Sequence, residues 1–283
     1  MKVIVAQTAG FCMGVQRAMT MVLEKIEQAL RPLYTYGSLI HNPQVLEELE
    51  QQGIRVLQTI PEKLEGTVVI RTHGVPAEIR HQIIAAGAMV CDATCPKVMK
   101  IHSIVERHSR DGDTIVIVGD KGHAEVLGLL GTAGEKGIVV SDPAEVETTA
   151  GRLAETISTG MCVVAQTTQS RKLFERIVAL FKERLVRVTV YDTICTATVD
   201  RQHEVLMLSR KVHVMVIVGG YRSANTTRLA AIAREAGVPT HHIEHAGELE
   251  RSWFENCEKV GVMAGASTPN WVTGEVVERL SSW

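Results

Sequence analysis

Cysteines recur in one local context at three places in this 283-residue chain. Asp92-Ala93-Thr94-Cys95 and Asp192-Thr193-Ile194-Cys195 each stand where an apolar run gives way to a polar, helix-starting segment. Cys12 occupies the same position after the run Val3-Ile4-Val5-Ala6. Three thiolates without a fourth partner in register suit a metal centre with one open coordination position, and such a vacancy is where a substrate binds.

The other three cysteines lack this context. A single cysteine is more often a small core residue than a ligand, but the repeated Asp-x-x-Cys favours ligands at positions 95 and 195. We assign Cys162, inside an apolar strand, and Cys257 to structure, and we expect Cys91 to point into its lobe. Soft thiolate donors by themselves fit zinc, copper or iron-sulfur clusters.

Histidines and hydroxyl residues follow other apolar runs. His41, His73 and His123 stand at strand-to-helix turns. A lone histidine there usually caps a helix or lies on the surface, but three in matching positions favour an anion site, because imidazole donors beside helix amino termini suit phosphate oxygens. The equivalent turns carry neutral donors, which can also cap helices, at Thr167, Thr168, Ser223, Asn225 and Ser267.

Glu125 is the one carboxylate in these turns that follows a histidine by two residues. A glutamate in a first helical turn is favoured electrostatically and needs no further role. In a closed pocket beside an anion it is instead a candidate proton donor. The sequence leaves both interpretations open.

Strand, polar turn and helix alternate through three rounds, and apolar strands covered by helices are typical of parallel α/β sheets. We predict three similar lobes: residues 14–95, residues 96–192, and residues 1–13 together with 193–283. Ligands of such sheets bind beyond the carboxyl ends of the strands. The first two turns of each round lie at nearly constant separations of 29, 28 and 30 residues, namely Cys12 to His41, Cys95 to His123 and Cys195 to Asn225.

Composition predicts a globular protein, with 45% hydrophobic and 22% charged residues. A formal net charge of −2 gives no reason to expect a nucleic-acid partner. No run of eighteen apolar residues predicts a membrane partner. The apolar run at the amino terminus is too short for a signal peptide, so we expect a cytoplasmic location with reduced cysteines. Nucleotide-binding glycine motifs do not occur.

Seven motifs in order resemble those of the 4-hydroxy-3-methylbut-2-enyl diphosphate reductases, the last enzymes of the methylerythritol phosphate route to isoprenoids. The resemblance extends from about Val3 to Trp271. The motifs are Gly10-Phe11-Cys12-Met13-Gly14-Val15, His41-Asn42-Pro43, Thr72-His73-Gly74-Val75, Asp92-Ala93-Thr94-Cys95-Pro96, Gly122-His123-Ala124-Glu125-Val126, Gln166-Thr167-Thr168 and Asp192-Thr193-Ile194-Cys195.

The resemblance implies a trefoil of three α/β lobes around a central pocket, with the amino-terminal strand completing the third lobe. It implies one 4Fe-4S cluster with an open iron, held by Cys12, Cys95 and Cys195. The implied oxidoreductase reaction is a two-electron, two-proton reductive dehydroxylation of 4-hydroxy-3-methylbut-2-enyl diphosphate to isopentenyl and dimethylallyl diphosphates. An electron donor such as ferredoxin or flavodoxin is implied as a partner.

The resemblance also implies a role for each turn. Glu125 would supply protons to the departing hydroxyl, His123 would stand by the phosphate and proton network, and Thr167 would position the hydroxyl or a water. The remaining substrate-binding positions are His41, His73, Thr168, Ser223, Asn225 and Ser267.

One position departs from the family pattern, which usually has two adjacent serines before the asparagine, whereas this chain has Ser223-Ala224-Asn225. A lost hydrogen bond to a charged group costs about 1.5 to 3 kcal/mol, unless Arg222 or a backbone amide replaces it. Three alternatives therefore stay open: a paralogue with another anionic substrate, a non-redox dehydratase using iron as a Lewis acid, or a non-catalytic metal or iron-sulfur regulatory protein.

Overall fold

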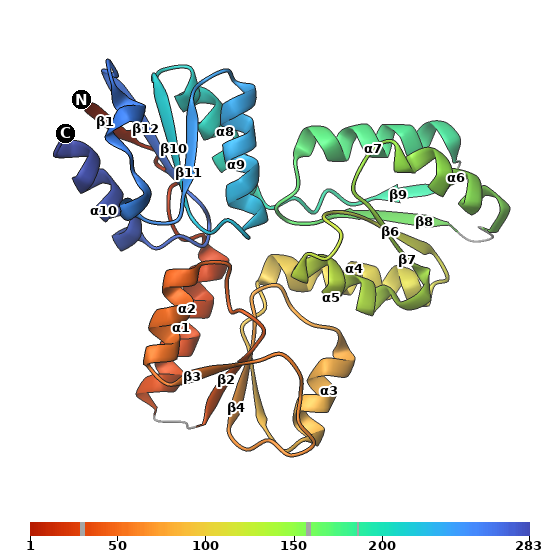
Figure 1. Ribbon diagram of the computed structural model, residues 1–283. Coiled ribbons are helices and arrows are strands. Elements are labelled where there is room, and N and C mark those ends of the chain that lie inside the picture. Colours follow the sequence, from red (N-terminus) through yellow and green to blue (C-terminus); the bar gives the residue numbers. More distant parts are fainter. Residues whose placement is uncertain (29–31, 157–159, 186) are drawn as a thin grey trace. The chain divides into compact units, whose positions relative to one another are not determined.

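The computed structural model describes residues 1–28, 32–156, 160–185 and 187–283, and these contain three four-stranded sheets (Figure 1). All strand pairings within the three sheets are parallel. The first sheet consists, in spatial order, of β3 (Ile54–Leu57), β2 (Leu33–Tyr36), β4 (Thr67–Ile70) and β5 (Met89–Asp92). The second consists of β7 (Gly137–Val140), β6 (Thr114–Val118), β8 (Met161–Ala165) and β9 (Val188–Val190). The third consists of β11 (Thr240–Ile243), β10 (Val214–Val218), β12 (Lys259–Ala264) and β1 (Lys2–Val5).

The three sheets share one strand order. In each, the chain lays down a strand, adds the next on one side of it and the third on the other. The fourth place is taken by β5, β9 and β1, so the strand nearest the amino terminus fills in the third sheet the place that a later strand fills in the others. Val3 pairs with Val260 and Val5 with Val262. This pairing confirms that the amino-terminal strand completes the third sheet.

Helices flank each sheet, because the continuous apolar runs of strands such as β8 and β10 are buried on both faces. Figure 1 shows α4 (Pro96–Arg110) and α5 (Ala124–Ala133) on one face of the second sheet, with α6 (Glu145–Thr156) and α7 (Arg171–Arg184) on the other. The third sheet packs against α8 (Thr196–Ser209) and α9 (Ala224–Glu235) through one hydrophobic cluster, and against α10 (Asn270–Ser281) through another. α3 (Ala77–Ala85) covers the first sheet with Ile79 and Ile83. The remaining elements are α1 (Met13–Glu27), α2 (Pro43–Gln51), η1 (Gly134–Lys136), η2 (Ala246–Glu248) and η3 (Arg251–Phe254).

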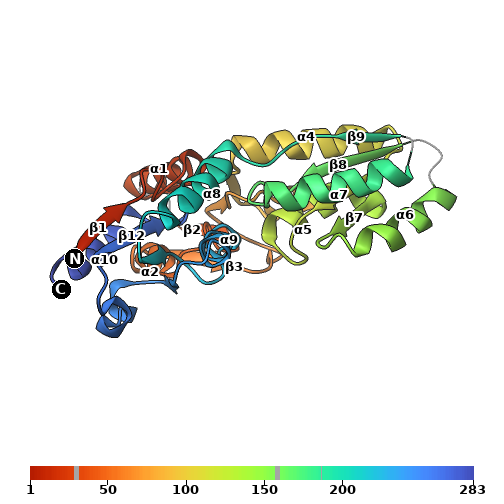
Figure 2. The ribbon, with the colours of Figure 1, turned by 90° about the horizontal axis from the view of Figure 1, so that it is seen from above.

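The chain forms two compact units. Residues 1–16, 40–53 and 196–283 make up one unit, and residues 17–39 and 54–195 make up the other. The first unit contains the third sheet, and within it the two chain ends lie near each other beside β1 and α10 (Figures 1 and 2). The second unit contains the first and second sheets. The strands of each sheet fall within one of the three predicted lobes, whose boundaries stay a prediction.

The polar turns after the strands are the start sites of helices. Asn42 caps α2 by accepting a hydrogen bond from the Val45 N–H at 3.0 Å, and Pro43 follows at the first helical position. Cys95 stands at the equivalent cap of α4, again before a proline. Each such turn therefore presents side chains both at a carboxyl strand end and at a helix amino terminus. Among the described residues, no helix combines the length and apolar character that crossing a bilayer requires.

Candidate active site

Each predicted ligand cysteine is tied through its backbone N–H to the turn that follows the third strand of a sheet. The hydrogen bonds run from Cys95 to the Thr72 carbonyl at 3.0 Å, from Cys195 to the Thr167 carbonyl at 2.9 Å, and from Cys12 to the Ala266 carbonyl at 3.1 Å. A helix begins at the residue after each cysteine. A thiol beside a helix amino terminus is more readily ionised, because the helix dipole stabilises the thiolate.

The six cysteines divide by burial into two classes. All six are free thiols, and Cys12, Cys95 and Cys195 are half-buried at the turns. Cys162 lies inside β8 with no exposed surface, and burial raises the pKa of its thiol to about 12. Burial likewise raises the pKa of Cys91. The three turn cysteines therefore have the accessibility that metal ligation needs, whereas these two core thiols do not.

Glu125 and Thr167 are brought together although they lie 42 residues apart. The Glu125 side chain is buried, with 1% of its surface exposed. Its Oε1 accepts from the Thr167 N–H at 2.7 Å, and its Oε2 accepts from the Thr167 hydroxyl at 2.6 Å. Because Cys195 also bonds to the Thr167 carbonyl, the buried carboxyl group is only one residue removed from a predicted ligand turn.

His123 caps α5 and lies against a second predicted site histidine. Its Nδ1 accepts from the Glu125 N–H at 3.2 Å. In the neutral ring this leaves Nε2 as the N–H donor. The rings of His123 and His73 meet edge to face with centroids 5.3 Å apart. Thr168, in the next turn, accepts at its hydroxyl from the Gln166 amide at 2.8 Å.

Ser223 and Asn225 lie at the start of α9 and are both buried. The Ser223 Oγ accepts from the Thr226 N–H at 3.3 Å and from the Thr226 hydroxyl at 3.0 Å, which leaves the Ser223 proton for another acceptor. The Asn225 Nδ2 finds no acceptor among the residues that the structure describes. A buried donor without a partner costs about 1 to 3 kcal/mol, so this amide suits a ligand with anionic oxygens.

Two further predicted residues lie in the same unit. The backbone of His41 approaches Gly220 so closely that a Cβ on Gly220 would stand 2.7 Å from the His41 carbonyl oxygen. Only glycine fits there, and it brings the His41 turn to the loop that leads to Ser223. Ser267 follows Ala266, whose carbonyl accepts from Cys12.

The predicted site residues are thus distributed over both compact units. Cys12, His41, Ser223, Asn225 and Ser267 belong to the unit with the third sheet. The other unit holds the remaining ones, which are His73, Cys95, His123, Glu125, Thr167, Thr168 and Cys195. Within each unit, the residues lie at the carboxyl ends of parallel strands.

The aspartates of the two Asp-x-x-Cys turns have a structural role that our sequence analysis did not assign. Asp92 accepts from the Thr94 N–H at 2.9 Å and pairs with Arg80 at 3.1 Å. Asp192 accepts from the Ile194 N–H at 3.2 Å and pairs with Arg171 at 2.7 Å. Both are Asx turns. The recurrence of the aspartate three residues before cysteine was the signal that could have identified this role.

Three other supporting residues gave no such signal. The fully buried Gln166 accepts from the Asp120 N–H at 2.8 Å and thereby joins the turn after β8 to the turn after β6. Glu204 and Arg201 on α8 contact the loop before Cys12. Because Glu204 and Thr8 are 196 residues apart, no local pattern could have linked them.

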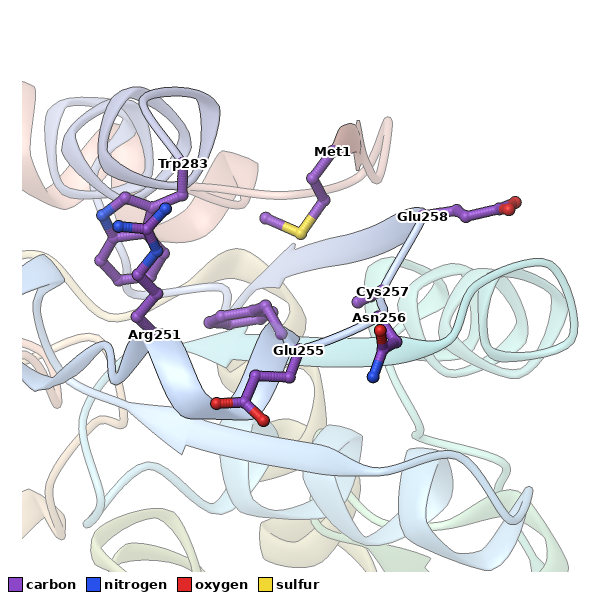
Figure 3. A pocket seen from close by; sticks show the side chains of 8 residues that line it. Met1, Arg251, Glu255, Asn256, Cys257, Glu258 and Trp283 are labelled. Atoms are coloured by element: carbon purple, nitrogen blue, oxygen red, sulfur yellow. The ribbon is translucent and has the colours of Figure 1, made fainter.

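A cavity of about 590 Å³ contains none of the predicted site residues (Figure 3). It lies beside the chain ends, and its lining residues are Met1, Arg251, Phe254, Glu255, Asn256, Cys257, Glu258 and Trp283. Burial raises the pKa of Cys257, so its thiol is not activated. We therefore place the candidate active site at the polar turns and not in this cavity.

Known proteins match the chain from end to end. The LytB protein family matches residues 3–281. The 4-hydroxy-3-methylbut-2-enyl diphosphate reductase of Alkaliphilus oremlandii is 40% identical over 284 residues and covers 100% of both chains. The protein of the same name from Geobacter sulfurreducens is 43% identical over 286 residues, which is 100% of this chain and 98% of the relative.

Solved structures match as well. One, described as (E)-4-hydroxy-3-methyl-but-2-enyl diphosphate reductase, the terminal enzyme of the non-mevalonate pathway, is 39% identical with a TM-score of 0.72 over 100% of both chains. The E-1-hydroxy-2-methyl-but-2-enyl-4-diphosphate reductase of Plasmodium falciparum is 25% identical with a TM-score of 0.90, over 99% of this chain and 88% of that one. The chain belongs to the LytB protein family.

Proposed function

We propose that this protein is a 4-hydroxy-3-methylbut-2-enyl diphosphate reductase, an oxidoreductase of isoprene biosynthesis by the methylerythritol phosphate pathway. The observation that carries the proposal is the match over the full chain to relatives of that name. The products would be isopentenyl and dimethylallyl diphosphates. The candidate active site supports this assignment because it combines soft metal donors, anion donors and a buried carboxyl group.

We assign Cys12, Cys95 and Cys195 as the ligands of one 4Fe-4S cluster with an open iron. The donor set supports this, since all three thiols are free, half-buried and placed at helix amino termini. When bound, the cluster supplies the electrons for the reduction and a Lewis acid for the departing hydroxyl group.

The diphosphate is assigned to the histidine and hydroxyl turns. The unpaired amide of Asn225 and the remaining hydroxyl proton of Ser223 support this, because both are buried donors that phosphate oxygens can satisfy. Ala224 contributes no hydroxyl, so the neighbouring donors carry this part of the site. The other assigned residues are His41, His73, His123, Thr167, Thr168 and Ser267.

The proton path is assigned to Glu125, Thr167 and His123. Glu125 holds the Thr167 hydroxyl at 2.6 Å, so a proton on the carboxyl group can pass to an oxygen beside that hydroxyl. His123 offers its Nε2 proton, because its Nδ1 accepts from the Glu125 backbone. The three residues together can protonate a departing hydroxyl and orient the water that forms.

Three further assignments belong to the proposal. The functional lobes are residues 14–95, residues 96–192, and residues 1–13 with 193–283. An electron donor such as ferredoxin or flavodoxin delivers the electrons. The protein acts in the cytoplasm on a small diphosphate, without a nucleic-acid or membrane partner.

Anaerobic purification followed by iron and sulfide analysis tests the cluster, and addition of the substrate with and without a reductant tests the reaction. We expect four irons and four sulfides per chain and product only with reductant. Product without reductant would instead identify a non-redox dehydratase. Zinc in place of iron would contradict the reductase proposal.

Glu125→Gln tests the proton path. We expect turnover to fall by about 10²- to 10⁴-fold, the usual contribution of general acid catalysis, while iron content stays at the wild-type level. Glu135→Gln is the matched control, because Glu135 is an exposed glutamate near the end of the same helical segment. Full turnover in Glu125→Gln would favour a non-catalytic regulatory protein.

A further inference from the structure

We propose that Glu204 and Arg201, on α8, are positioning residues that set the place of the Cys12 thiol. The inference rests on the proposed function, in which Cys12 is a cluster ligand. It adds two residues that contact neither cluster nor substrate but act through the loop between β1 and α1.

Glu204 holds the first half of this loop. Its carboxylate accepts three hydrogen bonds, from the Gln7 N–H at 2.5 Å, the Thr8 N–H at 2.8 Å and the Thr8 hydroxyl at 2.5 Å. Hydrogen bonds to an ionised carboxylate are roughly twice as strong as neutral ones. The chain is therefore fixed immediately after β1, at the point where it leaves the sheet.

Arg201 holds the second half. Its side chain is buried, and Nη2 donates to the Gly10 carbonyl at 2.8 Å, two residues before Cys12. Nη1 donates to the Ala197 carbonyl of its own helix at 2.9 Å, which fixes the direction of the guanidinium group. Gly10 has φ +101°, a conformation that a glycine adopts without strain.

The two residues act as a pair because they lie three positions apart on α8 and so share one face of the helix. The loop's printed backbone bonds are few: the Ala9 N–H donates to the Ala6 carbonyl, and the Cys12 N–H donates to the Ala266 carbonyl. Loss of either α8 contact should therefore let the loop move and displace the thiol.

Thiol labelling of the metal-free full-length chain tests this positioning directly. We expect Glu204→Ala to change the iodoacetamide reaction rate of Cys12 on the order of tenfold, as for the loss of one charge-assisted hydrogen bond, with Cys95 and Cys195 unchanged. Peptide mass spectrometry reads the three thiols separately, so two of them serve as internal controls. Glu204→Gln, which keeps one acceptor and the side-chain shape, should have a smaller effect.

Equal rate changes at all three thiols, or none at Cys12, would overturn the proposal. Asp200→Asn, an exposed position on α8, is the matched control. Arg201→Met should reproduce the selective change at Cys12.

The loaded protein gives an independent readout. We expect Glu204→Ala to retain wild-type thermal stability without the cluster but to alter the electron paramagnetic resonance spectrum of the reduced cluster. An unaltered spectrum together with unaltered Cys12 labelling contradicts the positioning role and leaves the reductase assignment intact. Absence of iron from the wild-type protein would instead contradict the proposed function.

Discussion

The turns that carry Cys95 and Cys195 are stabilised from within, whereas the turn that carries Cys12 is held from outside. Asp92 and Asp192 each cap the backbone N–H two residues further on. No aspartate precedes Cys12 at the matching distance, where Ala9 stands instead. The carboxylate there comes from Glu204 on α8.

All three turns nevertheless occupy the same place in the topology. They follow β5, β9 and β1, which are the fourth strands of their sheets. A carboxylate that accepts backbone N–H groups is present at each turn, but in one of them it is supplied by a distant helix. Equivalent geometry can therefore arise from a local motif or from a tertiary contact.

Replacing each turn cysteine by serine tests whether the three turns are equivalent in function. We expect Cys12→Ser, Cys95→Ser and Cys195→Ser each to abolish turnover and to lose most of the bound iron, because an alcohol is a poor replacement for a thiolate ligand. Iron analysis after anaerobic reconstitution measures the effect. Cys257→Ser is the control and should keep its iron. A Cys12→Ser protein with a full cluster would separate this turn from the other two.

Gly10→Ala sharpens the comparison, because it affects only the externally held turn. We expect a loss of about 1 to 3 kcal/mol in the free energy of unfolding, since an alanine at φ +101° is strained and its Cβ would meet the Asn270 side chain. Denaturant unfolding measures this. Gly237→Ala, at φ +83° with nothing within 4 Å, isolates the backbone strain alone. Equal losses in the two variants would mean that Asn270 adjusts without cost.

Asp92→Ala and Asp192→Ala remove the internal caps. Each should reduce the free energy of unfolding by about 1 kcal/mol, as for a lost helix-capping side chain. The asparagine variants keep the capping oxygen and lose only exposed ion pairs with Arg80 and Arg171, so they should lose less than about 0.5 kcal/mol. If the asparagine and alanine variants were equally destabilised, the ion pairs and not the caps would hold these turns.

The smallest expected effect is a pH dependence confined to the Cys12 turn. Burial by itself raises the pKa of Glu204, but the hydrogen bonds from Thr8 and Gln7 outweigh it and hold the pKa below its ordinary value of 4.5. The ionised side chain therefore stabilises the fold above about pH 4.5, and this contribution is lost as the pH falls through the lower folded-state pKa. The stability difference between wild type and Glu204→Gln should shrink over that range. A difference independent of pH would show that charge is not involved.

Several features of this protein could be predicted from its sequence. The alternation of apolar strands, polar turns and helices indicated parallel α/β sheets, and all pairings within the three sheets are parallel. The polar residues after the strands were predicted to cap helices, as Ser223 and His123 do. These features follow from contacts among residues close in the chain, whose geometry depends on local spacing.

Other features depend on the tertiary structure alone. The pairing of Glu125 with Thr167, the hold of Gln166 on the neighbouring turn, and the contact of Glu204 with Thr8 join residues separated by 42, 46 and 196 positions. A single sequence contains no spacing that encodes such contacts, because they form only when packed helices bring separate strand ends together. The sequence alone determined which residue types stand at the strand ends, and the packing of α5 and α8 decided which carboxylate serves which turn.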